Sequence, residues 1–226
     1  MISRVSSGNP DFDELLGGGY EADIVTMLYG GPGTGKTNIC LMTAAEVSRT
    51  KKVIFIDTEG SFSVDRFKQL TDDFEKCINN IFILCPTHFE EQKGAFKKLK
   101  ELTSKKDIGI IIVDSIAMLY RLEIGKTKNI QGTNRELGLQ ISYLSEIARK
   151  KKIPVLITNQ VYKDFEDKSK INIVGGDILK YWSKCLIEFR KIDDDKRIAT
   201  LRKHRSKAEN KQLKFKIINQ GIKKKN

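Results

Sequence analysis

Long apolar runs are missing from this chain of 226 residues. No stretch approaches the roughly 18 uninterrupted apolar residues of a membrane span, and residues 1–8 contain no apolar run of signal-peptide length. Cysteine is scarce, and the four cysteines show no Cys-x-x-Cys spacing, so neither a disulfide framework nor a zinc site is predicted. We therefore expect a cytoplasmic protein without a membrane partner.

Internal repeats are also absent, and a chain of this length suits one α/β domain better than two.

Charge is present but unevenly spread. Residues 197–226 hold eleven Lys and Arg against one acid, whereas residues 1–60 hold five bases against eight acids. This distribution predicts a polyanionic partner, for which nucleic acid is the usual candidate. A solvated lysine surface is the alternative that composition leaves open.

Apolar runs that alternate with helical patterns predict the fold class. Runs typical of buried parallel strands occupy residues 24–29, 53–57, 81–84, 108–114 and 154–159. Helical spacing occupies residues 37–50, 90–104 and 133–151. The alternation predicts an α/β fold, in which a mostly parallel sheet is flanked by helices.

The pattern changes after about residue 183. Segments 186–192, 197–203 and 213–218 predict antiparallel strands appended to the parallel sheet. Segments 121–132 and 161–176 lack apolar periodicity and are predicted to be loops. Both follow predicted core strands or their short extensions, at the edge where ligands bind in such sheets.

The run Gly30-Gly-Pro-Gly-Thr-Gly-Lys-Thr37 matches a phosphate-binding loop, or P-loop. It follows an apolar strand and opens a helix, so its backbone N–H groups are expected to wrap a nucleotide's phosphates. Lys36 is predicted to bridge the β- and γ-phosphates during catalysis, and Thr37 to offer its hydroxyl to Mg²⁺. The predicted nucleotide-binding residues of this segment are Gly30, Gly31, Pro32, Gly33, Thr34, Gly35, Lys36, Thr37 and Asn38.

A carboxylate at the end of a later strand supports the interpretation of this run as a P-loop. The apolar strand that begins at Ile110 ends in Asp114, which is predicted to reach the magnesium shell. Ser115 follows, where many mechanical ATPases place a water-activating Glu, so the general base must come from elsewhere. Glu59, at the end of the strand after the P-loop helix, is the predicted base because it could face the γ-phosphate from the opposite side.

The segment Asp57-Thr-Glu-Gly60 also fits the Asp-x-x-Gly motif of GTPases. A GTPase would need Asn-Lys-x-Asp on a later strand, but that place reads Thr158-Asn-Gln-Val161, so ATP is favoured. Gln160 ends the last parallel strand and is predicted to sense the γ-phosphate for the following loop. A glutamine that merely faces solvent is the alternative.

Several motifs together resemble the ATPase core of the RecA/RadA recombinase family, most closely an archaeal paralogue. The resembling segments are Ser7–Gly19, the P-loop, Ile56–Phe62, Ile112–Arg121, Leu156–Val161, Gly175-Gly176 and Lys203-His204-Arg205. The resemblance implies a RecA-like P-loop ATPase domain over residues 1–226, with ATP and Mg²⁺ as ligands. It also implies that Glu59 is the catalytic base, that Gln160 is the nucleotide sensor and that Arg66 stacks on adenine.

The resemblance further implies that the two predicted loops line a path for single-stranded DNA. The candidate contacts there are Arg121, Lys126, Lys128, Lys163, Lys168 and Lys170, with Tyr162 and Phe165 available for stacking. Lys203-His204-Arg205 is similar to a Lys-x-Arg pair that some RecA-class ATPases insert into a neighbouring subunit's site. On a strand, positions 203 and 205 would share a face. Contact with the DNA backbone and a solvated surface remain alternatives for this trio.

The chain departs from the recombinase pattern in its N-terminal part. It shows neither the helical DNA-binding domain nor the Phe-x-x-Ala hook that joins recombinase subunits. We therefore expect an accessory ATPase of recombination and DNA repair that binds DNA, hydrolyses ATP weakly and does not exchange strands by itself. Its expected partners are a RadA-type recombinase, other recombination proteins and other copies of the chain. The alternatives are a DNA-independent signalling ATPase and, less favoured, a small-molecule kinase.

Overall fold

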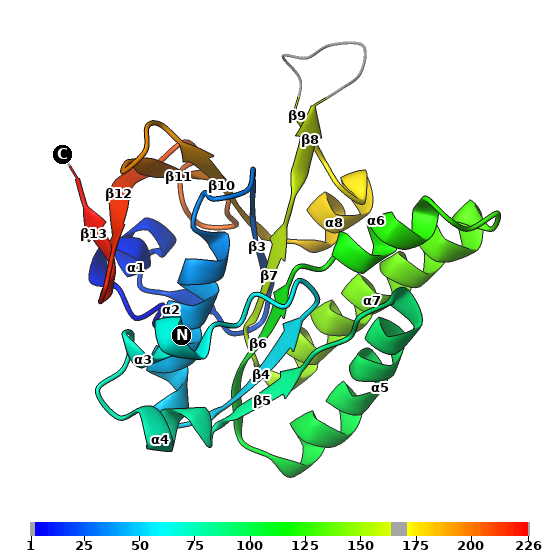
Figure 1. Cartoon of the computed structure of the whole chain (residues 1–226), viewed down its shortest axis with the longest axis horizontal. Coiled ribbons are helices and arrows are strands. Elements are labelled where there is room, and N and C mark those ends of the chain that lie inside the picture. The colour runs from blue at the N-terminus through cyan, green and yellow to red at the C-terminus, as the bar shows by residue number, and fades with distance from the viewer. Residues whose placement is uncertain (1–2, 164–170, 226) are drawn as a thin grey trace.

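A nine-stranded sheet forms the centre of the chain in a computed structural model that describes residues 3–163 and 171–225 (Figure 1). Its strands are β3 (Val25–Gly30), β4 (Lys52–Asp57), β5 (Ile81–Leu84), β6 (Ile108–Asp114), β7 (Val155–Asn159), β10 (Cys185–Lys191), β11 (Arg197–Lys203), β12 (Gln212–Ile218) and β13 (Gly221–Lys224). Their order is β13-β12-β11-β10-β3-β7-β6-β4-β5. Neighbours from β10 to β5 run parallel and those from β10 to β13 run antiparallel. The predicted fold class is therefore confirmed.

Helices cover both faces of the sheet (Figure 1). One face carries α1 (Pro10–Leu16), α2 (Lys36–Ser48), α3 (Val64–Lys68) and α4 (Phe74–Ile78). The other carries α5 (Phe89–Lys105), α6 (Met118–Ile124), α7 (Ile130–Lys151) and α8 (Gly176–Trp182). Within the described segments, no helix combines the length and the apolar character needed to cross a membrane.

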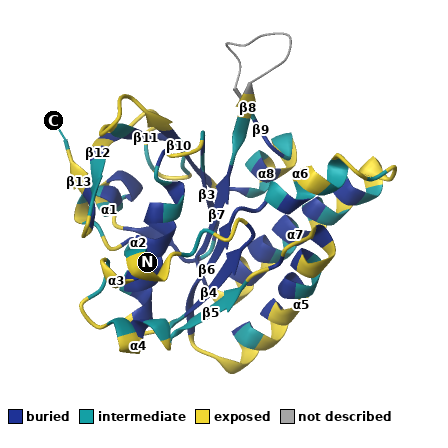
Figure 2. Ribbon diagram, in the orientation of Figure 1, coloured by how far each residue is buried: buried dark blue, intermediate teal, exposed yellow. Residues whose placement is uncertain are grey.

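Burial explains why the central strands are continuous apolar runs. All seven residues of β6 and all five of β7 are buried, because helices pack on both sides of these strands (Figure 2). Their register brings the carboxyl ends together: Asp57 at the end of β4 lies opposite Asp114 at the end of β6. Polar side chains that follow these strands therefore meet at one edge of the sheet.

Two small hairpin-like sheets lie outside the central one. β1 (Arg4–Val5) pairs with β2 (Tyr20–Glu21), and β8 (Val161–Lys163) pairs antiparallel with β9 (Ile171–Ile173). The second pair corrects the prediction that residues 161–176 form only a loop. β8 and β9 have three residues each, which is too few to show an apolar period, and within the described residues they pair only with each other.

The prediction of a loop over residues 121–132 is also wrong in part. α6 extends to Ile124 and α7 begins at Ile130, which leaves only a short connection between them. α6 buries Leu119 against the neighbouring helices, whereas Leu122 is 47% exposed, so the segment lacks the regular apolar stripe of a longer helix. Asn129 begins α7 by accepting a hydrogen bond from the Gly132 N–H.

Candidate functional site

The P-loop connects β3 to α2 at the carboxyl edge of the sheet. Gly30 lies against β10, where an added Cβ would come within 2.1 Å of the Phe189 carbonyl oxygen, so only glycine fits. Gly33 and Gly35 have φ values of +69° and +98°, which glycine adopts without strain. Across the described residues, no backbone N–H of residues 33–38 donates a hydrogen bond. These donors are therefore available at the helix N-terminus, as an anion site requires.

Lys36 begins α2 and folds back over the loop. Its ammonium donates hydrogen bonds to the carbonyl oxygens of Gly30 and Gly31, at 2.9 and 2.8 Å. Burial lowers the pKa of Lys36, whereas the nearby carboxylates of Asp114 and Glu59 act to raise it. The P-loop lysine and the two predicted acidic residues therefore interact electrostatically within one site.

Asp114 lies at the buried end of β6, where its side chain is 2% exposed. Thr158 donates a short hydrogen bond to Oδ1, and Ser61 donates one of 3.1 Å to Oδ2. Burial raises the pKa of Asp114, and hydrogen bonds from Thr158, Thr37 and Ser61 oppose that rise. A buried carboxylate beside a hydroxyl offers the hard oxygen donors that Mg²⁺ prefers, and few protein ligands suffice when phosphates supply the others. The residues present therefore fit the predicted ion.

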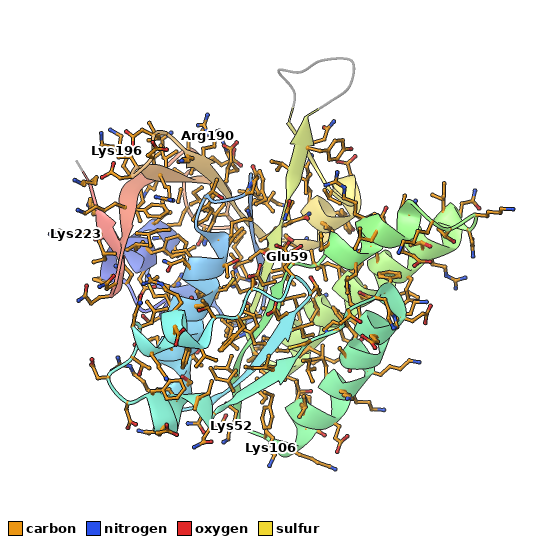
Figure 3. The ribbon with its side chains drawn as sticks, in the orientation of Figure 1. Lys52, Glu59, Lys106, Arg190, Lys196 and Lys223 are labelled. Atoms are coloured by element: carbon orange, nitrogen blue, oxygen red, sulfur yellow. The ribbon has the colours of Figure 1, made fainter. Side chains whose placement is uncertain are left out.

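Glu59 stands on a turn that Asp57 organises. The buried Asp57 carboxylate accepts backbone hydrogen bonds from Glu59, Ser61 and Phe62, at 3.2, 3.0 and 2.8 Å. The turn leaves the Glu59 side chain exposed beyond the end of β4, and Figure 3 places it between α2 and α6. An exposed carboxylate at this edge is free to approach a water molecule beside a bound phosphate.

Gln160 follows β7 and reaches the same point. Its Nε2 donates a hydrogen bond of 3.1 Å to Oε1 of Glu59, a residue 101 positions earlier in the chain. Gln160 also lines a small pocket together with Arg121 of α6 and Val174, which follows β9. The glutamine thus contacts the candidate base on one side and the elements of the candidate DNA path on the other.

Arg66 lies on α3 beside the start of α2. Its guanidinium donates to Oδ1 of Asn38 at 2.9 and 2.6 Å, and to the carbonyl oxygens of Ile218 and Asn219 at 2.7 and 3.0 Å. Asn38 also donates to the carbonyl oxygen of Gly221. The predicted adenine contact therefore lies against the turn between β12 and β13.

Sequence reasoning missed several of these supporting residues. Asp57, Ser61 and Thr158 hold the site together, and the β12–β13 turn completes the surroundings of Arg66. The turn had a usable signal, because Asn-Gln-Gly at 219–221 separates two alternating segments. Ser61 and Thr158 had none, because single hydroxyl residues at strand ends are common.

The candidate DNA contacts lie on α6, in the connection to α7 and on the β8–β9 segment, and not all of them are described. Arg121 is exposed on α6, and Lys126 and Lys128 are exposed in the connection before α7. Lys163 ends β8, whereas Phe165, Lys168 and Lys170 lie outside the described residues. Tyr162 of β8 is 41% exposed and remains available for stacking.

The trio Lys203, His204 and Arg205 does not form one strand face, because β11 ends at Lys203. The Lys203 ammonium donates to the carbonyl oxygens of Lys180 and Ser183, at 3.1 and 2.9 Å. The Arg205 guanidinium instead lies 2.6 Å from carboxylate oxygens of both Glu21 and Asp23. The two cations therefore occupy separate contacts within the chain.

Comparisons with known proteins show the family to which the chain belongs. A family model described as Rad51 matches residues 1–225. The chain is 43% identical over 222 residues to "DNA repair and recombination protein RadB" of Methanobrevibacter smithii, covering 95% of this chain and 93% of that protein. It is 44% identical over 220 residues to the protein of the same name from Methanococcoides burtonii, with 96% of each chain covered. The relative of this name from Methanosphaera stadtmanae is 42% identical over 219 residues, covering 95% and 93%.

Proposed function

Because the chain belongs to the Rad51 family, we propose that it is an ATP-binding accessory protein of homologous recombination and DNA repair. It binds DNA, hydrolyses ATP weakly and acts beside a strand-exchanging recombinase rather than replacing it. The names of its relatives support the role in repair and recombination. The hydrogen bond from Gln160 to Glu59 carries the proposal, because it joins the candidate base to the strand that leads into β8 and β9.

The chain's own residues would act on ATP as follows. The free N–H groups of residues 33–38 bind the phosphates, and Lys36 moves from its carbonyl partners to the β- and γ-phosphates. Thr37 and Asp114 would hold Mg²⁺, and the bound ion would neutralise charge on the phosphates. Glu59 accepts the proton of the attacking water, since its carboxylate is exposed at this edge.

The proposed weak turnover is explained by the contacts that Lys203 and Arg205 make within the chain. Lys203 and Arg205 are both engaged within the chain, so neither is free to serve a neighbouring ATP site without rearrangement. A cation supplied to such a site in trans accelerates related phosphoryl transfers by about 10³–10⁵-fold. We propose that assembly with other copies, or with a recombinase, is required for fast hydrolysis.

The central test is ATP turnover with and without single-stranded DNA and a RadA-type recombinase, run beside a solution mass measurement. We expect the isolated protein to turn over well below about 1 s⁻¹, the lower end of ordinary enzyme rates. Faster turnover by a monomer would contradict the proposed weak ATPase. A Lys36→Ala variant that kept full nucleotide affinity would contradict the assignment of the site.

DNA binding separates this proposal from a protein-directed signalling ATPase. Affinity for single-stranded DNA should fall steeply with salt, because log affinity decreases by about 0.7 per log unit of salt for each phosphate contact. The measurement is fluorescence anisotropy of a labelled oligonucleotide over a range of salt concentrations. Failure to bind even at low salt would favour the signalling alternative.

A further inference from the structure

Arg197 links the C-terminal strands to the P-loop. It begins β11, and its Nε donates a hydrogen bond of 3.2 Å to the carbonyl oxygen of Gly33. Its aliphatic stem also lies close to Gly35, where an added Cβ would be 3.7 Å from Cδ of Arg197 and 3.3 Å from Ile217. β11 and β12 therefore pack against the outer side of the loop, remote from it in sequence.

The Arg197 guanidinium differs from the cations next to it around the β10–β11 turn. Arg190, Lys191 and Lys196 each lie within 4 Å of a carboxylate, at distances of 3.7, 2.7 and 3.2 Å. In the described part of the chain, no carboxylate forms an ion pair with Arg197, and its guanidinium donates hydrogen bonds to the carbonyl oxygens of Gly33 and Asp195. Its charge is therefore directed at the backbone of the loop.

The hydrogen bond from Arg197 to Gly33 fixes the orientation of the Gly33–Thr34 peptide. A peptide unit is planar and trans, so the Gly33 carbonyl and the Thr34 N–H point in opposite directions. Arg197 holds the Gly33 carbonyl on the side of the loop that faces β11. The Thr34 N–H therefore points to the opposite side, with the other free donors of residues 33–38. A charged donor also polarises the peptide, which strengthens the N–H as a donor on the other side.

We propose that Arg197 is a positioning residue of the P-loop, which orients the Gly33–Thr34 peptide so that its N–H binds a nucleotide phosphate. The inference rests on the proposed ATP binding and deepens it. Arg197 acts through the backbone and not by touching the γ-phosphate. Nucleotides that share the diphosphate part therefore depend on it equally.

The test is the affinity of the full chain for fluorescent ATP and ADP analogues with Mg²⁺, measured by anisotropy. Arg197→Met keeps the aliphatic stem beside Gly35 and removes the donor. We expect it to weaken both nucleotides by about tenfold, the effect of losing one charge-assisted hydrogen bond. Arg197→Lys retains a charged donor of similar reach and should bind both within about threefold of the wild type.

The matched control is Lys196→Met, which removes one positive charge from the adjacent position and breaks the pair with Asp193, but leaves the loop contact intact. Its nucleotide affinities should equal those of the wild type. Equal losses of affinity in Lys196→Met and Arg197→Met would overturn the proposal. The overall positive electrostatic potential of the β10–β11 hairpin would then explain both losses. A loss for ATP without one for ADP would indicate direct γ-phosphate contact, which also overturns it.

Two further measurements keep the outcomes distinct. The thermal midpoint of nucleotide-free Arg197→Met, followed by circular dichroism, should match that of the wild type, because no carboxylate of residues 3–163 or 171–225 forms an ion pair with this side chain. Unchanged affinity in a folded Arg197→Met, with affinity lost in Lys36→Ala, refutes the positioning role alone. Wild-type protein that binds neither nucleotide refutes the proposed function itself.

Discussion

The phosphate edge of the sheet and the C-terminal antiparallel strands use charge in opposite ways. At the phosphate edge, Lys36 and Asp114 are buried, and their pKa values are shifted in the directions that burial dictates. In the C-terminal strands, Arg202 is paired with Glu188 at 2.6 Å, and Arg205 is paired with Glu21 and Asp23. The first region keeps its charges buried beside the proposed nucleotide site, whereas the second pairs some of its cations with acids elsewhere in the chain.

This difference changes what the basic C-terminal third means. The sequence places ten more positive than negative charges in residues 197–226, which predicted a polyanionic partner. The acids that pair with Arg202 and Arg205 lie outside that segment, so counting within it overstated the free charge. Charge available to a partner depends on tertiary contacts as well as on composition.

The largest effect should come from the phosphate edge. Glu59→Gln removes the candidate base but can still pair with Gln160, so turnover should fall by about 10²–10⁴-fold while ATP affinity changes little. The measurements are steady-state ATP hydrolysis and analogue binding on the same protein. Asp65→Asn, on the neighbouring α3, is the control for a lost carboxylate. Unchanged hydrolysis in Glu59→Gln would remove Glu59 from the mechanism.

The next effect concerns stability in the C-terminal strands. Glu21 is 1% exposed and lies between Arg4 and Arg205, at 3.2 and 2.6 Å. Arg205→Ala leaves this buried carboxylate with Arg4 alone, and should lower the free energy of unfolding by about 1–3 kcal/mol, discounted for the partial exposure of Arg205. Urea denaturation measures it, with the exposed Lys211→Ala as control. An Arg205→Ala protein of wild-type stability that binds DNA less tightly would instead identify Arg205 as a DNA contact.

A smaller effect tests whether unpaired cations are the ones that reach DNA. Lys126 and Lys128 are exposed and have no ion-pair partner among the described residues, whereas Lys191 and Lys196 are paired with Asp194 and Asp193. Replacing the first two by Glu should reduce the slope of log affinity against log salt by about 1–1.5. The same double replacement at 191 and 196 removes equal charge and should change the slope less. Equal changes in both would show that total charge governs binding.

The smallest effect is a pH dependence from His204. Burial lowers the pKa of His204, the Glu21 carboxylate acts to raise it, and the cations of Arg4, Lys207 and Arg205 act to lower it. Its Nδ1 accepts a hydrogen bond from the Ser206 N–H, which requires an unprotonated nitrogen. Because the unfolded chain takes up this proton first, stability should decline as the pH falls below 6.5 and level off below the folded pKa. His204→Gln should flatten this part of the stability curve, and an unaltered curve would contradict the assignment.

Sequence patterns located the central strands well, because burial on both faces leaves an unbroken apolar run. The predicted segment 108–114 matches β6 at both ends, and the predicted segment 154–159 begins one residue before β7 and ends with it. The same reasoning failed for α6 and for β8 with β9, where few residues are buried and no period develops. Short elements of this kind depend on their neighbours rather than on their own pattern.

The sequence alone determined the type of sheet and the identity of the candidate phosphate-binding residues, because a P-loop and strand-end carboxylates are local patterns with a local mechanism. Only the tertiary structure decided that Gln160 meets Glu59, that Arg197 contacts Gly33 and that Arg205 is paired with Glu21. Each of these contacts joins residues at least 101 positions apart, and the parallel crossovers and the long return of the C-terminal strands bring them together. No local pattern encodes such distances, so the partners of a charge or a donor emerge only when the sheet is assembled.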